Sequence, residues 1–318
     1  MPPSAPARWY NLSAVAVFHI PKTGGTSMRA WMGRTYGSGA LAYTDAACFF
    51  FLHRDIFTRY NRSGKQPCGG KQARAVLHRK RLSIEFHMWS EWRFWYELMP
   101  KAAELRERYA RAGGVFLATT LLRPPRDLVL SAYRYSRPMI SLGSAATPAG
   151  KRSLLVPLKA WLLAGADENA RAGVNIKKTG FPQASGIITR SLTCSHPGAL
   201  GCSAYVPAAS SRIVELCNSS LALTRLLSLD LVCLLANVSQ MAAFVARRTA
   251  SRFRRPPHLL HHSARTTANR SERSTLLLTP AETLALDRAA ACDERLFALM
   301  NARGVDVRTG CWSSGDDF

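Results

Sequence analysis

Acidic residues are scarce in this chain, whose 318 residues hold 20 Asp and Glu against 43 Lys and Arg, a formal net charge of +23. The sequence has no C-x-x-C pair and no acidic pair placed for a metal, so we expect no zinc and no other metal site. Repeats, low-complexity tracts and long linkers are also missing. With 47% hydrophobic residues, the sequence predicts one domain over residues 1–318, with its core at about 14–302 and short extensions at both ends.

An apolar segment able to cross a membrane is missing as well. Met1–Tyr10 has no apolar core of the kind found in secretory signals, and Leu221–Ala246 is interrupted by Arg225 and Asp230. Five N-x-[ST] sequons nevertheless occur, at Asn11, Asn61, Asn218, Asn237 and Asn269. Such sequons favour a secretory lumen. We therefore expect either a luminal protein whose anchor lies outside this chain, or a protein outside the secretory route.

Eight cysteines, an even number, predict disulfides and so an oxidising compartment. They stand at positions 48, 68, 194, 202, 217, 233, 292 and 311. Cys194 and Cys202 flank a short loop with Pro and Gly, and they are the pair that we expect to be bonded. Cys233 lies in an apolar run, which favours a buried thiol.

The basic surplus has two explanations that the sequence leaves open. A strongly positive protein attracts polyanions such as nucleic acid, anionic glycans or a membrane surface. The basic residues are, however, spread along the whole chain, with short clusters at Arg252–Arg255 and His78–Arg81. That distribution also fits arginine used simply as a solvated surface residue.

Short apolar runs alternate with helical patterns along the chain. The expected strands are Ala14–Ile20, Leu82–His87, Val115–Leu122 and Leu229–Leu235. The expected helices begin near Thr26, Glu91, Arg126, Ile213, Ser239 and Thr279, the second with a break at Pro100. This alternation predicts an α/β fold in which a parallel sheet is flanked by helices on both faces.

The stretch His19-Ile-Pro-Lys-Thr-Gly-Gly-Thr-Ser27 joins the first expected strand to the first expected helix. A glycine loop before a helix presents backbone N–H groups to an anion. Lys22 adds a positive charge, and Thr26 and Ser27 add hydroxyl donors. The pattern is not a Walker A loop, because Lys22 precedes both glycines. The structural alternative is an ordinary turn before a helix that Thr26 or Ser27 caps.

Pro21-Lys-Thr-Gly-Gly-Thr-Ser27 after a strand resembles the 5′-phosphosulfate loop of sulfotransferases that use 3′-phosphoadenosine 5′-phosphosulfate (PAPS). Within that family it resembles the Golgi carbohydrate enzymes of the heparan sulfate and uronyl 2-O-sulfotransferase type. The resemblance implies a P-loop-NTPase-like sheet, PAPS as co-substrate, and a catalytic role for Lys22. It also implies cofactor contacts from Pro21, Lys22, Thr23, Gly24, Gly25, Thr26, Ser27, Arg123 and Ser131.

The family's 3′-phosphate motif, R-D-P-x-x-R-x-x-S-x-Y, has a partial counterpart in this chain. The residues in register are Arg123, Pro125, Ser131 and Tyr133. Pro124 stands where the family has Asp, and Leu128 stands where it has a second Arg. Arg126 comes two residues early and can replace that second Arg. A guanidinium fork and a hydroxyl that converge on one phosphate suit its charge.

Glu85 and His87 end the second expected strand, where family members of the 2-O type carry a catalytic His. By this resemblance His87 takes the proton of the acceptor hydroxyl, a role that suits a side chain titrating near neutral pH. Glu85 is the rival, because related 3-O-type enzymes use Glu. Alternation along a strand places both side chains on one face, so the sequence leaves the choice open.

Three further features stay open. Arg190 lies in an element that resembles the family's T-R-x-L, and it contacts an anionic acceptor or the cofactor, or it is a plain surface residue. Arg265–Ser271 lies where the family often closes a late loop over the nucleotide. The aromatic residues at 89, 92, 94, 95 and 96 either form a core face or stack on sugar rings.

The leading hypothesis is a Golgi enzyme that moves a sulfuryl group from PAPS to an acceptor hydroxyl, of a carbohydrate or anionic glycan, without a metal or a nucleic-acid partner. It meets a membrane only through an anchor outside the chain. An ATP-dependent kinase is the second hypothesis, but the loop lacks the Lys after its glycines, and Asp230 begins rather than ends its strand. A non-catalytic module that binds polyanions is the third, and it leaves the glycine loop unexplained.

Overall fold

The structure is a computed structural model of the chain. It describes residues 13–42, 46–53, 55–57, 81–87, 90–136, 139–142, 152–155, 158, 160–161, 174–175, 186–193, 217–249, 278–305, 307 and 310–314.

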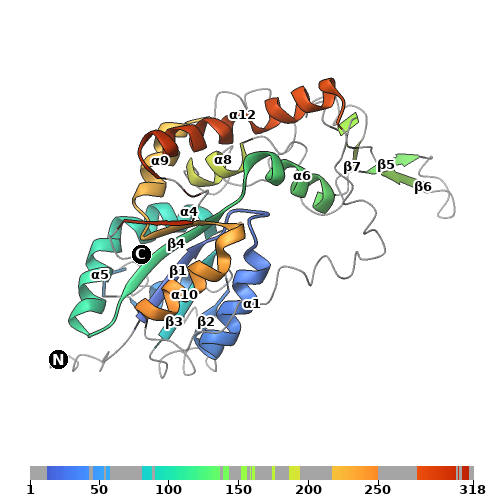
Figure 1. Ribbon diagram of the computed structural model, residues 1–318. Coiled ribbons are helices and arrows are strands. Elements are labelled where there is room, and N and C mark those ends of the chain that lie inside the picture. The colour runs from blue at the N-terminus through green and yellow to red at the C-terminus, as the bar shows by residue number, and fades with distance from the viewer. Residues whose placement is uncertain are drawn as a thin grey trace.

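Six strands form the main sheet, in the order β2-β3-β1-β4-β8-β9 (Figure 1). Its centre consists of β1 (Ser13–Phe18), β3 (Arg81–Phe86) and β4 (Phe116–Leu122). The shorter strands are β2 (Ala40–Leu41), β8 (Leu231–Leu234) and β9 (Cys311–Ser313). Every pair is parallel except β8 with β9. The prediction of a parallel sheet therefore holds for all but the edge strand β9, which is antiparallel.

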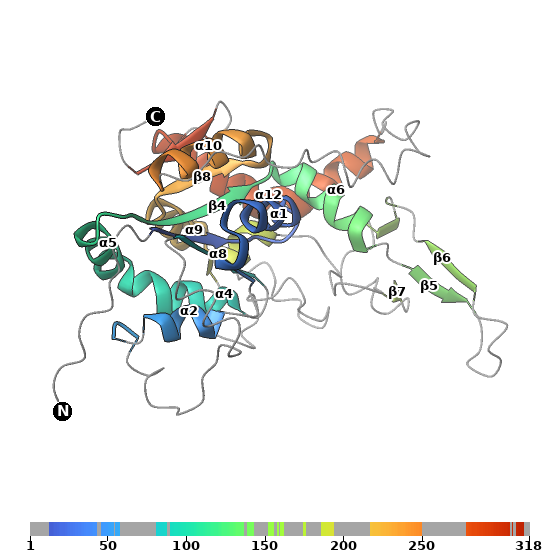
Figure 2. The same cartoon turned by 90° about the horizontal axis from the view of Figure 1, so that it is seen from below.

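Side chains of β1 alternate between the two faces of this sheet. Ala14, Ala16 and Phe18 join one core cluster, whereas Val15 and Val17 join another. The cluster around Val15 is covered by α1 (Gly25–Tyr36) and α10 (Val238–Arg248). The cluster around Ala14 is covered mainly by α2 (Ala46–Leu52), α5 (Ala102–Arg111), α9 (Ser219–Leu227) and α12 (Pro280–Ala302). Helices thus flank both faces, and the α/β class is confirmed (Figures 1 and 2).

Two helix signals of the sequence behave as expected. The region predicted as a helix with a break at Pro100 divides into α4 (Glu91–Arg93), the π-helical turn η5 (Phe94–Leu98), the 3₁₀ turn η6 (Met99–Lys101) and α5. Thr279 caps α12, since its hydroxyl accepts from the Glu282 amide at 3.3 Å. The Glu282 carboxylate in turn accepts from the Thr279 amide at 2.6 Å, which completes a capping box.

The remaining elements are shorter or lie outside the main sheet. They are η1 (Gly37–Gly39), α6 (Pro125–Ser136), α8 (Ile187–Thr193) and η9 (Leu235–Asn237). A second, antiparallel sheet has the order β6-β5-β7, made of β5 (Met139–Leu142), β6 (Arg152–Leu155) and β7 (Val174–Asn175). Both ribbon views place this small sheet away from the main one (Figures 1 and 2).

Two disulfides join segments that are distant in sequence. Cys233 on β8 bonds Cys311 on β9, its register partner, so the expectation of a free thiol at Cys233 is wrong. Cys217, just before α9, bonds Cys292 on α12. The expected pair of Cys194 and Cys202 lies outside the described residues. Disulfides of this kind suggest an oxidising secretory or extracellular environment.

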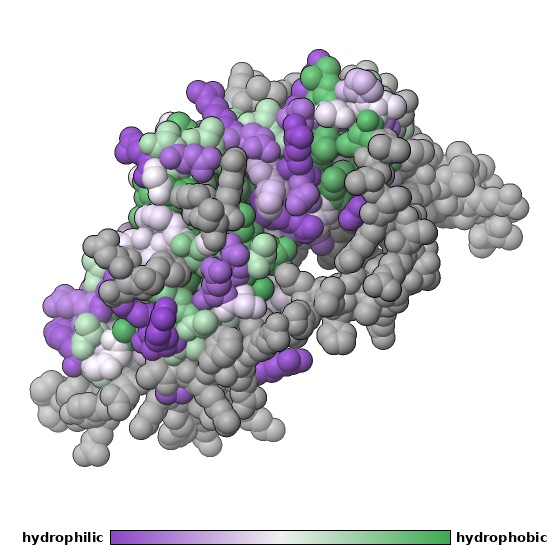
Figure 3. All heavy atoms as spheres, viewed as in Figure 1, coloured by the Kyte–Doolittle hydropathy of each residue, from purple (hydrophilic) through white to green (hydrophobic). Residues whose placement is uncertain are grey.

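The described part of the chain offers no helix with the length and apolar character needed to span a membrane. Hydrophilic side chains gather over the outer face of α5 (Figure 3). There the exposed residues Lys101, Glu104, Glu107 and Arg111 carry both signs of charge. Lys101 pairs with Glu104 at 3.0 Å. The overall positive charge of the chain is therefore not expressed as a basic surface at this face.

The strand order places a site before any side chain is considered. The chain builds β3 and β2 on one side of β1, and then crosses to build β4 and β8 on the other. Open α/β sheets bind ligands at the carboxyl ends of the strands where the order reverses in this way. At that edge β1 runs into the glycine loop, β3 ends before His87, and β4 ends before Arg123. Topology thus brings together residues that three separate motifs predicted.

Candidate functional site

The loop between β1 and α1 begins the helix differently from the prediction. Gly24, not Thr26 or Ser27, is the N-cap residue, with a φ of 96° that glycine adopts without strain. The amides of Ser27 and Met28 donate to the Gly24 carbonyl at 2.9 and 3.1 Å. Helix geometry leaves the amides of Gly25 and Thr26 without an acceptor inside the helix. These two N–H groups therefore face the space beyond the N-terminus of α1.

Thr23 shapes the loop from within. Its hydroxyl donates to the Ile20 carbonyl at 2.7 Å, and its amide donates to the same oxygen at 3.3 Å. The turn holds Lys22 at a φ of 67°, and no other non-glycine residue in the described part of the chain has a positive φ. Such a conformation costs about 1–3 kcal/mol, and strain of this kind concentrates at functional sites.

Two cations stand at the mouth of this loop. Burial, and after it the positive charge of Arg123, lower the pKa of Lys22 from 10.5 to about 8. Arg123 leaves the end of β4 and donates from Nη1 to the Lys22 carbonyl at 3.3 Å. Burial also lowers the pKa of Arg123, with Asp127 opposing the shift, but an arginine stays charged at any ordinary pH. The loop is therefore half-buried and positively charged, which would suit an anion.

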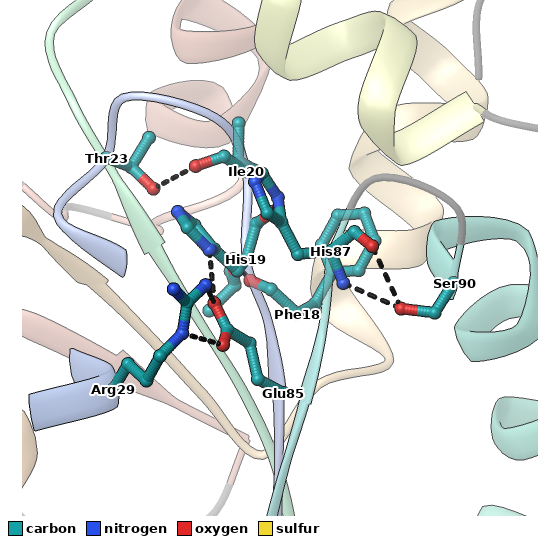
Figure 4. Close-up of polar contacts among 9 residues, drawn as sticks. Phe18, His19, Ile20, Thr23, Arg29, Glu85, His87 and Ser90 are labelled. Atoms are coloured by element: carbon teal, nitrogen blue, oxygen red, sulfur yellow. Dashed lines mark hydrogen bonds and ion pairs between the residues drawn. The ribbon is translucent and has the colours of Figure 1, made fainter. Parts of the chain in front are cut away.

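Pairing of β1 with β3 sets the neighbouring histidines side by side. Phe18 stands opposite Phe86, so the next residues, His19 and His87, follow in parallel, and their rings stack with centroids 3.9 Å apart. His87 donates from Nδ1 to the His19 carbonyl oxygen at 3.0 Å. Because a carbonyl can only accept, the neutral His87 ring carries its lone pair on Nε2. The Ser90 hydroxyl accepts from the His87 amide at 2.8 Å and fixes this turn (Figure 4).

Glu85 is a carboxylate buried beneath these histidines, with 1% of its side chain exposed. His19 donates to it from Nδ1 at 2.5 Å. Arg29, on α1, donates from Nε at 2.7 Å and from Nη2 at 2.9 Å (Figure 4). A bidentate guanidinium gives both strength and a fixed geometry. One carboxylate thus ties β1, β3 and α1 together.

The two residues proposed as bases differ in their electrostatics. Burial acts to raise the pKa of Glu85, but the hydrogen bonds from His19 and Arg29 outweigh it and lower the pKa to about 2. Burial, followed by the electrostatic effect of the neighbouring His19, lowers the pKa of His87 to about 3. At neutral pH Glu85 is therefore an anion held in three hydrogen bonds, whereas His87 is neutral. Of the two, His87 is the neutral side chain, and its pKa lies well below the near-neutral value expected from the sequence.

Gly25 leaves the space that the His19 ring occupies. A Cβ at Gly25 would lie 1.7 Å from Cε1, 1.9 Å from Nε2 and 2.2 Å from Nδ1 of His19. No pair of heavy atoms tolerates such overlap, so any side chain at this position displaces the ring from Glu85. A Cβ at Gly24 would likewise lie 2.2 Å from a methyl carbon of Leu235. The lack of a side chain at Gly24 and Gly25 therefore makes room for Leu235 and His19.

The predicted 3′-phosphate residues are only partly assembled. Arg123 reaches the loop, and Ser131 lies half-buried on α6. Arg126, expected to replace the family's second Arg, instead pairs through Nη2 with Asp287 of α12 at 2.6 Å. Tyr133 packs on Trp161 with ring centroids 5.4 Å apart. Ser27 is half-buried, and the Thr26 side chain lies outside what the structure describes.

Arg190 is buried, with 5% of its surface exposed, so of the two alternatives the plain surface arginine is wrong. The alternative of a contact with an acceptor or cofactor stays a prediction. Burial lowers its pKa, while the charges of Asp293 and Glu91 oppose that shift. Asp293 also accepts from the Ile188 and Thr189 amides at 3.2 and 2.9 Å, which caps the start of α8. These contacts describe a buried charge cluster between helices.

The aromatic run divides between core and surface. Phe94 and Trp95 are buried, as expected for a core face. Tyr96 is 47% exposed, and its hydroxyl accepts from Arg225 at 3.0 Å. Trp89 and the late loop Arg265–Ser271 lie outside the described residues.

Sequence reasoning missed two members of the site. His19 was part of the loop motif but had no role, and Arg29 was not considered. Register is the signal for His19, because a residue one past the end of β1 must meet the residue one past the end of β3. Helical spacing is the signal for Arg29, which lies four residues after Gly25 and so on the same side of α1.

No family model, no curated protein and no solved structure matches this sequence. Within the residues that the structure describes, no three His, Cys, Asp or Glu side chains gather to form a metal site.

Gly25→Ala should destabilise the protein by about 1–3 kcal/mol, the usual effect of overpacking. The matched control is Gly33→Ala, on the same helix, where an added Cβ meets nothing within 4 Å. That variant should gain up to about 1 kcal/mol from helix propensity. Urea unfolding of both variants gives the measurement. Equal effects of the two substitutions would contradict the placement of His19 against Gly25.

Glu85→Gln should remove a pH-dependent part of the stability. Because the folded pKa of about 2 lies below the ordinary 4.5, the carboxylate stabilises fully above the ordinary pKa and loses this effect as pH falls toward 2. This difference between the folded and the ordinary pKa contributes about 3 kcal/mol to the free energy of unfolding at neutral pH. The stability gap between wild type and variant should therefore shrink from pH 5 to pH 3. Urea titrations that give a constant gap over this range would contradict an ionised, hydrogen-bonded Glu85.

Proposed function

We propose that this chain is a PAPS-dependent sulfotransferase that moves a sulfuryl group to an acceptor hydroxyl, and that the acceptor is a carbohydrate. One observation carries the proposal: the positively charged loop that holds Lys22 and the neutral His87 lie at the same edge of the sheet, at the carboxyl ends of its strands. The Lys22 loop suits a phosphosulfate, and His87 suits the proton of an attacking hydroxyl. The order of strand, loop and helix at β1 also supports a P-loop-NTPase-like sheet.

The loop binds the 5′-phosphosulfate in this proposal. The amides of Gly25 and Thr26 donate to its oxygens, and the macrodipole of α1 favours the negative charge. As the bond from sulfur to the bridging oxygen breaks, negative charge grows on that oxygen. The Lys22 ammonium stabilises this charge more in the transition state than in the ground state, which is the condition for a rate effect.

His87 serves the other reactant. The acceptor oxygen attacks sulfur in line with the departing phosphate oxygen, and the hydroxyl proton passes to His87 Nε2. A histidine whose pKa is about 3 is a weak base, so it takes the proton late, as the oxygen–sulfur bond forms and makes the hydroxyl strongly acidic. Most of the rate enhancement then comes from positioning and electrostatics.

Arg123 supports the 3′-phosphate assignment. Its guanidinium has five N–H groups, and the contact with the Lys22 carbonyl uses one of its nitrogens. The remaining donors can serve a phosphate, with the Ser131 hydroxyl as the second partner. The contact also couples the two phosphate sites, because Arg123 touches the backbone of the residue that binds the other end of the same ligand.

The kinase alternative loses its candidate carboxylate. Asp230 precedes β8 and accepts from Arg106 at 3.0 and 3.2 Å and from the Ala118 amide at 2.6 Å. It therefore lies at the amino end of its strand, on the edge of the sheet opposite the loop. A Mg²⁺–ATP site needs a carboxylate beside the phosphates, and Asp230 does not supply it.

The compartment follows from the disulfides and the proposed chemistry. Cys217–Cys292 and Cys233–Cys311 suggest an oxidising environment. Carbohydrate sulfation by enzymes of the resembling type takes place in the Golgi lumen. We therefore propose that compartment for this chain.

Adenosine 3′,5′-bisphosphate, the product of PAPS, should stabilise the folded protein. At 100 times its Kd, linkage gives about 2.7 kcal/mol. A thermal shift series with the bisphosphate, with ATP and with ATP plus Mg²⁺ separates the hypotheses. Stabilisation by ATP and Mg²⁺ alone would favour the kinase, and no shift with any nucleotide at millimolar concentration would leave only the polyanion-binding module.

Lys22→Ala and Lys22→Gly should both lower affinity and kcat, since both remove the ammonium. They should differ in stability, because glycine relieves the strain of the positive φ and alanine does not. In the wild type, bisphosphate affinity should fall as pH rises through the Lys22 pKa of about 8, where the ammonium loses its proton. Isothermal calorimetry from pH 6.5 to 9.5 checks this, with Lys22→Gly as the control that should lose the alkaline decline.

A further inference from the structure

The stacked histidines at the ends of β1 and β3 have unequal partners. His19 donates from Nδ1 to the ionised Glu85 at 2.5 Å, whereas His87 donates from Nδ1 to a carbonyl at 3.0 Å. A carboxylate stabilises a positive ring far better than a carbonyl does. If either ring of the stack carries a positive charge, it is therefore His19.

The second nitrogen of His19 faces the loop. Its Cε1–Nε2 edge lies directly over Gly25, the first residue of α1, since a Cβ there would overlap both atoms. Figure 4 shows the ring between Glu85 on one side and the loop with Thr23 on the other, with the second nitrogen directed away from Glu85. His19 Nε2 therefore adjoins the amides that the N-terminus of α1 presents.

We propose that His19 is a further ligand of the anion held by this loop, and that it binds as an imidazolium. It donates Nδ1–H to Glu85 and Nε2–H to an oxygen of the anion, and a ring that donates through both nitrogens carries both protons. The inference rests on the proposed function and adds a contact to it. The ligand class is a phosphate or phosphosulfate group, which accepts hydrogen bonds on every side.

The charges that face His19 make its protonation depend on the ligand. Glu85 from β3 favours the imidazolium. Arg29 from α1, which shares that carboxylate, opposes it, and so do Lys22 in the loop and the N-terminus of α1. Arg123, at the end of β4, adds positive charge beside Lys22. A bound phosphate group brings about two negative charges, and these tip the balance toward the charged ring.

The same charge explains why the stack holds two histidines. Two positive rings 3.9 Å apart would repel each other strongly, so a charged His19 keeps His87 neutral. Where the environment separates the pKa values of two neighbouring titratable groups, one group serves as the acid and the other as the base. His19 is thus the cationic ligand on the anion side, and His87 keeps its Nε2 lone pair for the acceptor hydroxyl.

Nitrogen-15 NMR of the histidine side chains tests this assignment in the intact chain at pH 7.5. Chemical shifts separate protonated from bare ring nitrogens, and His19→Asn and His87→Asn identify the signals. With saturating adenosine 3′,5′-bisphosphate, His19 should show two protonated nitrogens and His87 one protonated and one bare. A neutral His19 in the saturated complex would overturn the proposal.

Affinity gives a second measurement with a matched control. His19→Asn keeps an amide donor near Glu85 but loses the donor toward the loop, so bisphosphate affinity should fall about tenfold or more, the usual loss for a hydrogen bond to a charged group. His87→Asn keeps a donor to the His19 carbonyl and should leave affinity within about threefold, a free-energy difference below that of one such hydrogen bond. Equal affinities of the His19→Asn variant and the wild type would also overturn the proposal.

The inference and the proposed function fail in different ways. If the bisphosphate does not bind the wild-type protein, the PAPS assignment fails, and inorganic phosphate then serves as the probe of the loop. A charged His19 in the phosphate complex would support His19 as a ligand of the anion even though the nucleotide does not bind. Tight bisphosphate binding beside a neutral His19 would keep the enzyme assignment and reject the role of His19.

Discussion

The rest of the site depends on one buried carboxylate. Glu85 would be expensive to ionise in a site that exposes only 1% of its side chain, and it is ionised because Arg29 and His19 surround it with donors. The same three hydrogen bonds fix the end of β1, the end of β3 and the first turns of α1 relative to one another. Removing one partner would leave a buried charge uncompensated, which is far more harmful than never having had the pair. The network therefore fixes the position of the loop between β1 and α1.

Glycine in the loop follows from this constraint rather than from turn geometry alone. Gly25 has an ordinary helical conformation, and another residue could adopt its backbone angles. Its lack of a side chain is required because the His19 ring, held by Glu85, fills that space. Gly24 meets both demands, a positive φ and close approach to Leu235. A glycine pair that looks from the sequence like a phosphate loop is thus also a packing requirement of the histidine.

The sequence predicts local features well and pairings poorly. β1, β3, β4, the break at Pro100 and the cap at Thr279 follow from short patterns of apolar, proline and capping residues, which act within a few positions. The bond from Cys233 to Cys311 joins residues 78 positions apart, and β9 is too short to carry a pattern. The roles of His19 and Arg29 also depend on register and on a helix packed against a strand. The N-cap of α1 was predicted wrongly for a different reason. Hydroxyl residues usually cap helices, but the turn at Thr23 places Gly24 at that position instead.

The residues argued to form the site carry more positive than negative charge. Lys22, Arg29 and Arg123 are three cations, and Glu85 is the one anion among the residues argued to form the site. The fall of the Lys22 pKa to about 8 shows the cost, since burial and a neighbouring arginine already weaken its hold on its proton. The strained φ of the same residue adds to it. A dianion bound as proposed would relieve this repulsion and would meet donors that are already in place. In the proposed function, the charge and geometry that are unfavourable in the loop by itself become the source of anion affinity, because these groups are in place before the ligand binds.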